Sequence, residues 1–298
     1  MRLDRLVALG IVGPVRRISA ALPARRPETR RRRLPILMYH SVGEDRGEAV
    51  APYYRTATAP GRFAEQMRFL RRSGWRAVSL AAGLAALAED SEGAAAQKLV
   101  AVTFDDGFGD FYREAMPVLR ETGFGATMFV PTAYLAGDGA RRQFCGRDCL
   151  TWLEVQSLHS EGIEFGSHTR THPQLASLGW DQIQEEITGS KRELEERLGC
   201  AADNFSYPYA FPQARPDFCD RFREVLLQAG YHACVTTQIG TATAGDDPFR
   251  LPRLPVNGAD DLALFAAKLE GAYDWMAGPQ LAFKALKRRT VVRDTPES

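Results

Sequence analysis

Short apolar runs alternate with amphipathic stretches along most of this 298-residue chain. Apolar runs of this length, bounded by glycine, proline or charged residues, predict buried strands. They lie at residues 35–40, 98–104, 125–130, 163–168, 204–208, 232–236 and 250–256. Strands separated in this way by helical patterns favour βα units and a parallel sheet.

Three of the intervening stretches repeat apolar residues at helical spacing and end at a glycine: 60–74, 180–199 and 215–230. In the first, Phe63, Met67 and Leu70 share one helix face, and Gly74 is the expected C-cap. The pattern predicts an α/β protein, and about seven strands fit a (β/α) barrel better than a flat doubly wound sheet. Neither a GxGxxG nor a P-loop motif supports a nucleotide-binding fold.

The pattern and composition divide the chain into a basic N-terminal arm at 1–33, a single domain at 34–270, and a C-terminal helix and tail at 271–298. The arm holds ten arginines against Asp4 and Glu28, a surplus of eight, and subtracting eight from the net charge of +1 leaves −7 for the rest. Nucleic acid is not an expected partner, because this acidic body carries no basic, aromatic-laced surface.

The apolar run at residues 6–12 is far shorter than the roughly 20 residues of a membrane span, and Asp4 before it weakens any match to a secretory signal. Two interpretations of the arm stay open. It is either an amphipathic segment that contacts an anionic membrane, or a disordered basic tail without a specific role.

The five cysteines include no CxxC pair. Cys145 and Cys149 could form a disulfide or bind a metal, but the odd count favours unpaired thiols in a reducing compartment. We therefore expect a cytoplasmic protein, with peripheral contact at the inner membrane if the arm binds lipid, and export as the alternative. The sequence makes no prediction of the oligomeric state.

Polar side chains stand where several predicted strands end, which is where a parallel barrel carries its chemistry. His40 ends the first strand, Asp105 and Asp106 end the second, and His168 ends the fourth. Two adjacent acids repel each other, and burying either without a partner is costly. A cation bound beside them would remove this objection.

The segment "GSHTRTHP" at 166–173 supplies two further ligands for such a cation. His168 and His172 are four residues apart, and a tight turn would bring both imidazoles to one side. The glycine before them and the proline after them predict a strand-to-loop transition. Together with a carboxylate from "FDDG", the histidines would form a His₂Asp set with open positions for water and substrate. These ligands suit Zn²⁺, Co²⁺, Ni²⁺ or Mn²⁺ and do not by themselves fix the metal.

The motifs "TFDDG", "SHTRTHP" and "FSYPYA" resemble the first three motifs of the NodB-homology polysaccharide deacetylases, carbohydrate esterase family 4. The resemblance covers residues 34–257. It implies a distorted (β/α) barrel that uses a divalent metal, usually zinc, to remove acetyl groups from N-acetylated sugars. The segment "LPILMYHSV" is similar to the branch that deacetylates exopolysaccharides such as poly-N-acetylglucosamine.

The resemblance also implies roles for individual residues. Asp106, His168 and His172 would hold the metal, and Asp105 would be the general base. The backbone N–H of Tyr209 would stabilise the negative charge on the acyl oxygen. Arg253 in "LPRLPV" would pair with Asp105, lower its pKa and keep it ionised.

His40 is the expected general acid that protonates the leaving amine, because a histidine titrates in the right range and ends the first strand. A core histidine bonded to a backbone carbonyl is the alternative. Two family motifs, aspartate–tryptophan and a C-terminal leucine-x-histidine, are not matched, and Ala210 stands where the family commonly has glycine. Ala210 should be tolerated if its φ stays negative.

Further residues carry weaker expectations. The aromatic side chains of Tyr207, Tyr209 and Phe211 could offer flat faces to a sugar ring, or they could belong to the core. Thr103 and Ser167 could hydrogen-bond to the site or serve only in packing. The sequence thus predicts a metal-dependent hydrolase of N-acetylated amino sugars. The alternatives are an inactive glycan-binding module and a metal-dependent glycosyltransferase.

Overall fold

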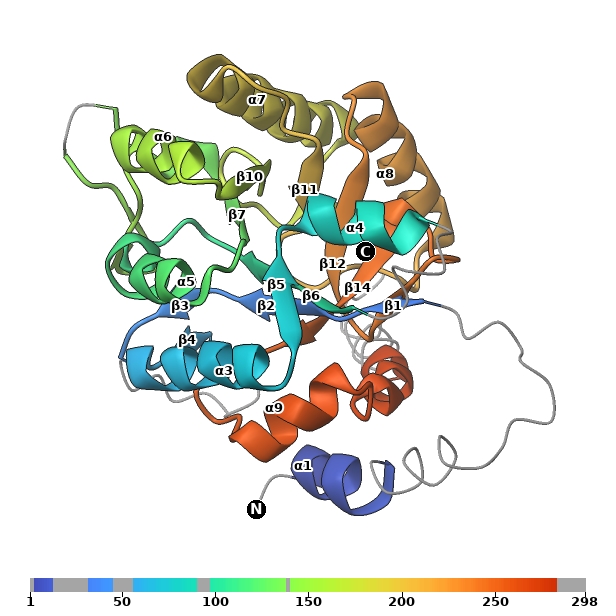
Figure 1. Ribbon diagram of the computed structural model, residues 1–298. Helices are drawn as coiled ribbons and strands as arrows, with labels where there is room; N and C mark the ends of the chain where they lie inside the picture. Colours follow the sequence, from blue (N-terminus) through green and yellow to red (C-terminus); the bar gives the residue numbers. More distant parts are fainter. Residues whose placement is uncertain (1–2, 13–31, 45–55, 90–96, 138–139, 283–298) are drawn as a thin grey trace.

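Seven parallel strands close into a barrel at the centre of the protein (Figure 1). The computed structural model describes residues 3–12, 32–44, 56–89, 97–137 and 140–282. Around the barrel the strands follow the order β2 (Ile36–Tyr39), β14 (Leu251–Pro255), β12 (Ala233–Ile239), β11 (Asn204–Ser206), β10 (Glu164–Ser167), β7 (Thr127–Val130) and β6 (Lys98–Phe104). Pairing of β2 with β6 closes the ring, with Ile36 opposite Ala101 and Tyr39 opposite Phe104. All seven predicted strands are confirmed.

An eighth parallel strand, β5 (Trp75–Val78), pairs with the first half of β6 and was not predicted. It follows Gly74 directly and spans only four residues. Ala77 is its only fully buried side chain, while Arg76 is exposed. A strand with one buried position shows neither an apolar run nor a clear alternation, so its sequence carries almost no strand signal.

Helices surround the barrel (Figure 1). They are α3 (Pro60–Arg72), α4 (Leu80–Ala88), α5 (Met116–Thr122), α6 (Trp152–Ser160), α7 (Trp180–Leu198), α8 (Pro216–Gln228) and α9 (Leu262–Leu269). The three predicted helices are confirmed as α3, α7 and α8. Each is followed by a glycine in the left-handed region, with φ of 73° at Gly74, 68° at Gly199 and 79° at Gly230.

Three short two-stranded sheets complete the structure: β1 (Arg33–Leu34) with β13 (Ala242–Thr243), β3 (Ser41–Val42) with β4 (Ala57–Thr58), and β8 (Gln143–Phe144) with β9 (Arg147–Asp148). The β8–β9 hairpin turns through Cys145 and Gly146, which both have positive φ. It lies beside the loop that follows β6, because Gly109 N–H donates to Asp148 O at 2.8 Å and Leu150 N–H donates to Gly107 O at 2.8 Å.

The start of the chain forms a helix, α1 (Leu3–Val7), that continues as a π-helical turn over Ala8–Val12 and packs beside α9 (Figure 1). Arg5 Nε donates to Asp261 at 2.8 Å, Tyr273 Oη donates to Asp4 at 2.7 Å, and Ala8 is fully buried. Most of the predicted basic arm, residues 13–31, lies outside the described residues, as does most of the predicted C-terminal tail. None of the described helices has both the length and the apolar character to cross a membrane.

Aromatic packing supports the carboxyl end of the barrel. Tyr39, at the end of β2, stacks on Phe104, at the end of β6, with ring centroids 5.3 Å apart. Phe111 contacts Phe104 edge-on at 4.8 Å, and Phe63 of α3 lies 5.7 Å from the same ring. These fully buried rings hold the ends of two neighbouring strands in place. The residues that follow each strand, His40 and Asp105, therefore leave the core at fixed positions.

Candidate active site

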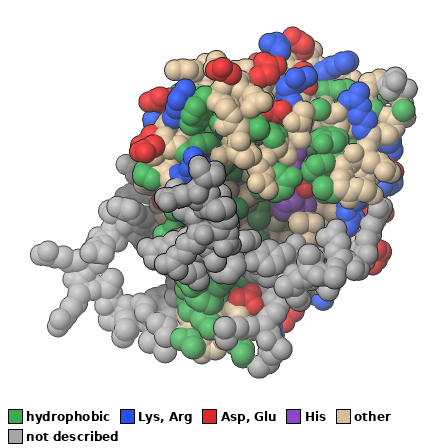
Figure 2. Space-filling model, turned by 180° about the vertical axis from the view of Figure 1, so that it is seen from behind, with side chains coloured by type: hydrophobic (Ala, Val, Ile, Leu, Met, Phe, Trp, Pro, Cys, Tyr) green, Lys and Arg blue, Asp and Glu red, His purple; other side chains and the backbone are tan. Residues whose placement is uncertain are grey.

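Side chains from four strand ends converge at the carboxyl end of the barrel. Asp105 and Asp106 follow β6, His168 follows β10, His40 follows β2, and Tyr209 lies three residues beyond β11. Figure 2 shows histidine side chains set back among hydrophobic ones on the face opposite to that of Figure 1. The predicted strand-to-loop transition at "GSHTRTHP" is confirmed, because β10 ends at Ser167.

Asp106, His168 and His172 direct their ligand atoms at one point. These atoms all lie within 4.8 Å of one another, and all three residues are buried. The Nε2 atoms of His168 and His172 are 3.1 Å apart, and each faces Asp106 Oδ1, at 3.5 and 3.3 Å. One carboxylate oxygen and two imidazole nitrogens held this way suit a divalent metal of the zinc type. The donor set fits the group that the sequence predicts.

Two residues of the site adopt strained backbone conformations. Asp106 and His172 both adopt the left-handed region, with φ of 71° and 56°. Such residues cost about 1–3 kcal/mol each when they are not glycine, and they concentrate at functional sites. The histidine loop is held by Glu186 of α7, whose carboxylate accepts the N–H groups of Arg170 and Thr171, each at 2.8 Å. Glu186 therefore fixes the loop that carries His172.

A hydrogen bond sets the tautomer of His168. Its Nδ1 lies 2.7 Å from Ser206 O, so Nδ1 carries the proton and donates, and Nε2 keeps its lone pair for a metal. His172 differs, because its buried Nδ1 has no hydrogen-bond partner among the described residues. Burial lowers the pKa of His172. Burial also acts to lower the pKa of His168, but the charges of Asp105 and Asp106 outweigh it and the pKa is raised.

Asp105 forms a separate, fully buried pair with Arg253. The guanidinium donates two parallel hydrogen bonds, Nη1 to Oδ1 at 2.8 Å and Nη2 to Oδ2 at 2.7 Å. Arg253 also donates to Thr236 O at 3.0 Å, to Thr103 Oγ1 at 3.2 Å and to Ser206 Oγ at 3.1 Å. A buried ion pair is tolerated only when its remaining donors are satisfied in this way. The structure thus brings together the arginine and the aspartate that the sequence analysis paired.

The two neighbouring aspartates are both held ionised, by different partners. Burial acts to raise the pKa of Asp105, but the charges of Arg253 and His168 outweigh it and leave the pKa below the ordinary value. Burial acts in the same direction on Asp106. Hydrogen bonds from His168 and His172 overcome it and hold the pKa of Asp106 well below its usual range. The adjacent carboxylates can therefore coexist as anions, each with its own cationic or hydrogen-bonding group.

The loop after β11 is clamped by Thr237, at the far end of β12. Its hydroxyl donates to Tyr209 O at 3.0 Å and accepts the N–H of Phe211 at 3.1 Å. Tyr209 takes the left-handed conformation, with φ of 58°, whereas Ala210 is not among the residues with positive φ. Alanine is therefore compatible with this loop, as the sequence analysis required. The ring of Tyr209 contacts His172, with centroids 4.5 Å apart.

The three aromatic residues near the end of β11 were expected either to face a sugar or to belong to the core, and the structure separates them. Tyr207 and Phe211 are buried and pack on each other at 5.0 Å, so that role is wrong for both. Tyr209 remains 48% exposed and keeps a free face. Thr103 hydrogen-bonds to Arg253, as above, and donates to Leu37 O at 2.7 Å. Ser167 bonds to Ser190 of α7 at 2.6 Å and also accepts the N–H of Thr169, in the histidine loop, at 3.2 Å.

His40 lies next to both aspartates. Asp105 N–H donates to Tyr39 O at 3.0 Å, so the two strand ends are hydrogen-bonded neighbours. His40 is half-buried, and its charge contributes to lowering the pKa values of Asp105 and Asp106. A polar side chain at this place has access to the mouth of the site.

The cysteines form no disulfide in the described chain, which includes all five. Burial raises the pKa of Cys149 to about 12, and the charge of Asp106 adds to this effect. Cys149 therefore stays protonated, and a protonated thiol is neither a nucleophile nor a good metal ligand.

Several residues that shape the site were not identified from the sequence: Glu186, Ser206, Thr237 and Phe144. Ser206 offers its carbonyl to His168, and Phe144 of the β8–β9 hairpin packs against His172 at 4.8 Å. Glu186, Thr237 and Phe144 are common residue types that lie outside the quoted motifs, whereas Ser206 belongs to the "FSYPYA" motif. Only the position of Ser206 at a strand end gave a signal that could have been used.

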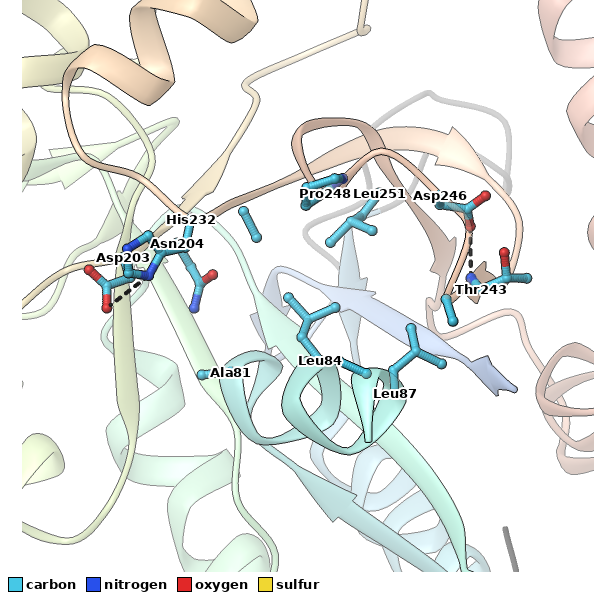
Figure 3. Close-up of a pocket in the computed structure, with 13 residues that line it drawn as sticks. Ala81, Leu84, Leu87, Asp203, Asn204, His232, Thr243, Asp246, Pro248 and Leu251 are labelled. Carbon is cyan, nitrogen blue, oxygen red and sulfur yellow. Dashed lines mark hydrogen bonds and ion pairs between the residues drawn. The ribbon is translucent and has the colours of Figure 1, made fainter. Parts of the chain in front are cut away.

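A cavity of about 420 Å³ at the opposite end of the barrel contains none of these residues (Figure 3). Leu84 and Leu87 of α4 and Leu251 line its apolar part. The polar groups at its edge are paired with each other, His232 with Asp203 at 3.5 Å and Thr243 N–H with Asp246 at 2.7 Å.

Comparison with known proteins agrees with this geometry. The family model for polysaccharide deacetylase matches residues 92–234, the region that contains the "FDDG" and "SHTRTH" segments. The chain is 28% identical to YxkH of Bacillus subtilis (strain 168), itself described as a candidate polysaccharide deacetylase, over 242 residues that cover 80% of this chain and 76% of the relative.

Solved structures give the same result. The deacetylase PplD of Streptococcus pyogenes, determined in complex with acetate, matches with a TM-score of 0.68 and 25% identity, over 81% of this chain and 99% of that one. IcaB from Ammonifex degensii matches with a TM-score of 0.65 and 26% identity, over 81% and 97%. The fold and the site thus define a hydrolase of the deacetylase class. This chain therefore contains a polysaccharide deacetylase domain.

Proposed function

We propose that this protein removes N-acetyl groups from the amino sugars of a glycan, using a divalent metal held by Asp106, His168 and His172. The observation that carries the proposal is the convergence of these three ligand atoms next to a second carboxylate, Asp105, which is bound to Arg253 instead. One acid is available to the metal, and the other is free to exchange a proton. This division of labour is what hydrolysis of an amide requires.

The residues of the chain have distinct tasks in this reaction. A bound metal would polarise the acyl carbonyl and lower the pKa of the attacking water. Asp105, kept ionised by Arg253, accepts the proton of that water. The backbone N–H of Tyr209, in the loop clamped by Thr237, donates to the acyl oxygen as negative charge develops on it. His40 then protonates the nitrogen of the leaving amine.

The role of His40 can be separated from the rest of the mechanism by the choice of leaving group. We expect His40→Gln to lower kcat on an N-acetylated oligosaccharide by about 10²–10⁴, because an amine is expelled only when protonated. The same variant should keep its activity on 4-nitrophenyl acetate, whose leaving phenolate needs no proton. Parallel assays on both substrates measure this. Equal losses on the two substrates would show that His40 has another task.

The proposed substrate is an N-acetylated amino-sugar polymer or a lipid-linked glycan, and Zn²⁺ is the proposed metal. The site is open on one side, where the exposed ring of Tyr209 can contact a sugar. A cavity of about 410 Å³ at the same end of the barrel, between β3 and the β8–β9 hairpin, gives room for further sugar units. Its lining includes Asp110, Arg147 and Asp148, which can hydrogen-bond to sugar hydroxyls.

Acetate release tests this function. Protein treated with a chelator would be supplied in turn with Zn²⁺, Co²⁺, Ni²⁺ and Mn²⁺ and assayed on oligomers of N-acetylglucosamine and on other N-acetylated and N-formylated glycans. We expect acetate release that disappears with the chelator and returns with metal. Undiminished release after complete metal removal, or none from any substrate, would refute the proposal.

The two alternative functions make different predictions. A glycosyltransferase would hold one metal and a sugar nucleotide with both carboxylates of the aspartate pair. Here only Asp106 faces the histidine pair, whereas Asp105 is paired with Arg253. An inactive glycan-binding module would bind the oligomers in calorimetry without releasing acetate. Calorimetry with sugar nucleotides and with glycans, run beside the acetate assay, distinguishes all three.

We further propose that the N-terminal segment contacts anionic membranes while it remains packed on α9. Asp4, Arg5 and Ala8 face the body of the protein, whereas the side chains of Leu6 and Ile11 are 41% and 61% exposed. Two exposed apolar side chains next to an arginine-rich stretch suit the surface of an anionic bilayer. A membrane-bound position would bring the site close to a lipid-linked glycan.

Sedimentation with vesicles tests this contact. The double variant Leu6→Glu/Ile11→Glu should reduce binding to vesicles that contain phosphatidylglycerol, because two charges replace the apolar side chains. Leu153→Glu is the matched control, since Leu153 is 68% exposed on α6, away from the N-terminal segment. Equal binding of the double variant and the control would exclude a membrane role for these residues.

A further inference from the structure

The two histidines of the metal site are held in different ways. His168 is oriented by the hydrogen bond from its Nδ1 to Ser206 O. His172 has no equivalent bond, because its buried Nδ1 is without a partner in the part of the chain that the structure describes. A metal-ligating histidine usually donates its second nitrogen to a neighbour, which fixes the plane of the ring. Some other contact must orient the imidazole of His172.

Aromatic rings surround His172 instead. Phe144 lies 4.8 Å from the imidazole, centroid to centroid, with an interplanar angle of 57°, and Tyr209 lies at 4.5 Å and 65°. Tilted contacts of this kind are favourable for aromatic pairs and restrict the rotation of the ring. Tyr209 is about half exposed and lies on a loop, whereas Phe144 is half-buried on a strand. Phe144 is therefore the better fixed of the two contacts.

The hairpin that carries Phe144 is tied to the loop of another metal ligand. Leu150 N–H donates to Gly107 O, directly after Asp106, and Gly109 N–H donates to Asp148 O, each at 2.8 Å. Tyr134 supports the ring of Phe144 from the side, at 4.8 Å. The position of Phe144 is thus set relative to Asp106 by the backbone, and relative to His172 by ring packing.

We infer that Phe144 is a positioning residue that orients the imidazole of His172 toward the metal in place of the missing hydrogen bond. The inference rests on the proposed metal site, and it assigns the β8–β9 hairpin a part in metal binding. Substituting a residue that orients a metal ligand typically lowers metal affinity by about 10–100-fold. Because Phe144 is half-buried, its replacement leaves the barrel core intact.

Zinc affinity, measured by competition with a chromogenic chelator, tests this inference without using activity. Phe144→Ala should lower zinc affinity by about 10–100-fold, and Phe144→Tyr, which keeps the ring, should restore it. The visible absorption spectrum of the Co²⁺-loaded protein should change in Phe144→Ala and not in Phe144→Tyr, because the spectrum reports ligand geometry. Tyr134→Leu is the matched control, since the ring of Tyr134 contacts Phe144 but, among the described residues, makes no ring contact with His172.

The outcomes are distinct. Unchanged affinity and an unchanged cobalt spectrum in Phe144→Ala would overturn the inference, as would equal losses in Phe144→Ala and Tyr134→Leu, which would indicate a general loosening of the aromatic cluster. If the unsubstituted protein binds zinc but releases no acetate, the proposed function fails and the affinity measurements still decide the role of Phe144. Thermal unfolding of each variant, recorded without metal, confirms that the fold is retained.

Discussion

Asp105→Asn is expected to lower kcat for deacetylation by about 10²–10⁴, because the amide cannot accept the proton of the attacking water. The metal should stay bound, since the ligand set of Asp106, His168 and His172 is unchanged. Acetate release and zinc content, measured on the same sample, check both halves of this expectation. An Asp105→Asn protein that kept its zinc and its activity would show that another group is the base.

Asp106→Asn is the matched comparison, because it makes the same substitution at the neighbouring residue. It should lose zinc as well as activity, since a neutral amide is a much weaker ligand for Zn²⁺ than a carboxylate. The pair of variants therefore separates proton transfer from metal binding at two adjacent positions. If both variants lost zinc equally, the division of roles between the two acids would be wrong.

Arg253→Met is expected to destabilise the protein at pH 7 by about 3–5 kcal/mol, the usual cost of breaking a buried ion pair. Arg253 is fully buried, and Asp105 would be left as an unpaired buried anion. Activity at pH 7 should fall as well, because burial alone raises the pKa of Asp105 and a protonated base cannot accept a proton. Chemical denaturation and acetate release measure the two effects.

The difference in stability between Arg253→Met and the unsubstituted protein should depend on pH. In the unsubstituted protein the pKa of Asp105 is lowered, so its contribution to stability is present above the unfolded pKa and is lost as the pH falls through the folded pKa. In Arg253→Met the folded pKa of Asp105 would be raised, so the loss of stability begins as the pH rises past the unfolded pKa and is complete above the raised folded pKa. The stability difference between the two proteins should therefore narrow as the pH falls toward 4.

The double variant Asp105→Asn/Arg253→Met is the control for the ion pair. It removes both charges, and replacing both members of a buried pair is often close to neutral for stability. We expect it to regain most of the stability that Arg253→Met loses, although it stays inactive. A double variant as unstable as Arg253→Met would mean that the volume of the arginine side chain matters more than its charge.

The sequence was sufficient for the barrel because its strands are buried on both sides. Runs such as residues 36–39 and 99–104 are continuous or nearly continuous in apolar residues, and their spacing by helices with glycine ends leaves few alternatives. Strand β5 was not predicted because Ala77 is its only buried residue. A strand or helix is therefore easier to predict from the sequence when more of its side chains are buried in the core.

The site was predictable where function requires rare residue types at strand ends. Two adjacent aspartates after a buried run and a spaced histidine pair are unusual enough to be recognised, and the structure brings Asp106, His168 and His172 together. The residues that support the metal ligands are common residue types, and they lie outside the two motifs. Glu186 lies on a helix and Phe144 on a hairpin, so only the tertiary fold shows that they serve the site.

Tyr207 and Phe211 show why a motif does not fix the direction of a side chain. Both lie in the "FSYPYA" region or directly beside it, yet both are buried and pack against Phe222 of α8. Tyr209 alone faces outward, because its left-handed backbone turns it away from its neighbours. The alternation of burial within five residues depends on the loop conformation, which the sequence does not state.

The most direct test is a crystal of the protein grown with zinc, with diffraction measured on both sides of the zinc absorption edge. We expect an anomalous peak about 2.0–2.2 Å from one oxygen of Asp106 and from the Nε2 atoms of the two histidines of the "SHTRTH" loop. Asp105 should remain hydrogen-bonded to Arg253 and should not coordinate the metal. A peak at another site, or one that also takes Asp105 as a ligand, would contradict this expectation.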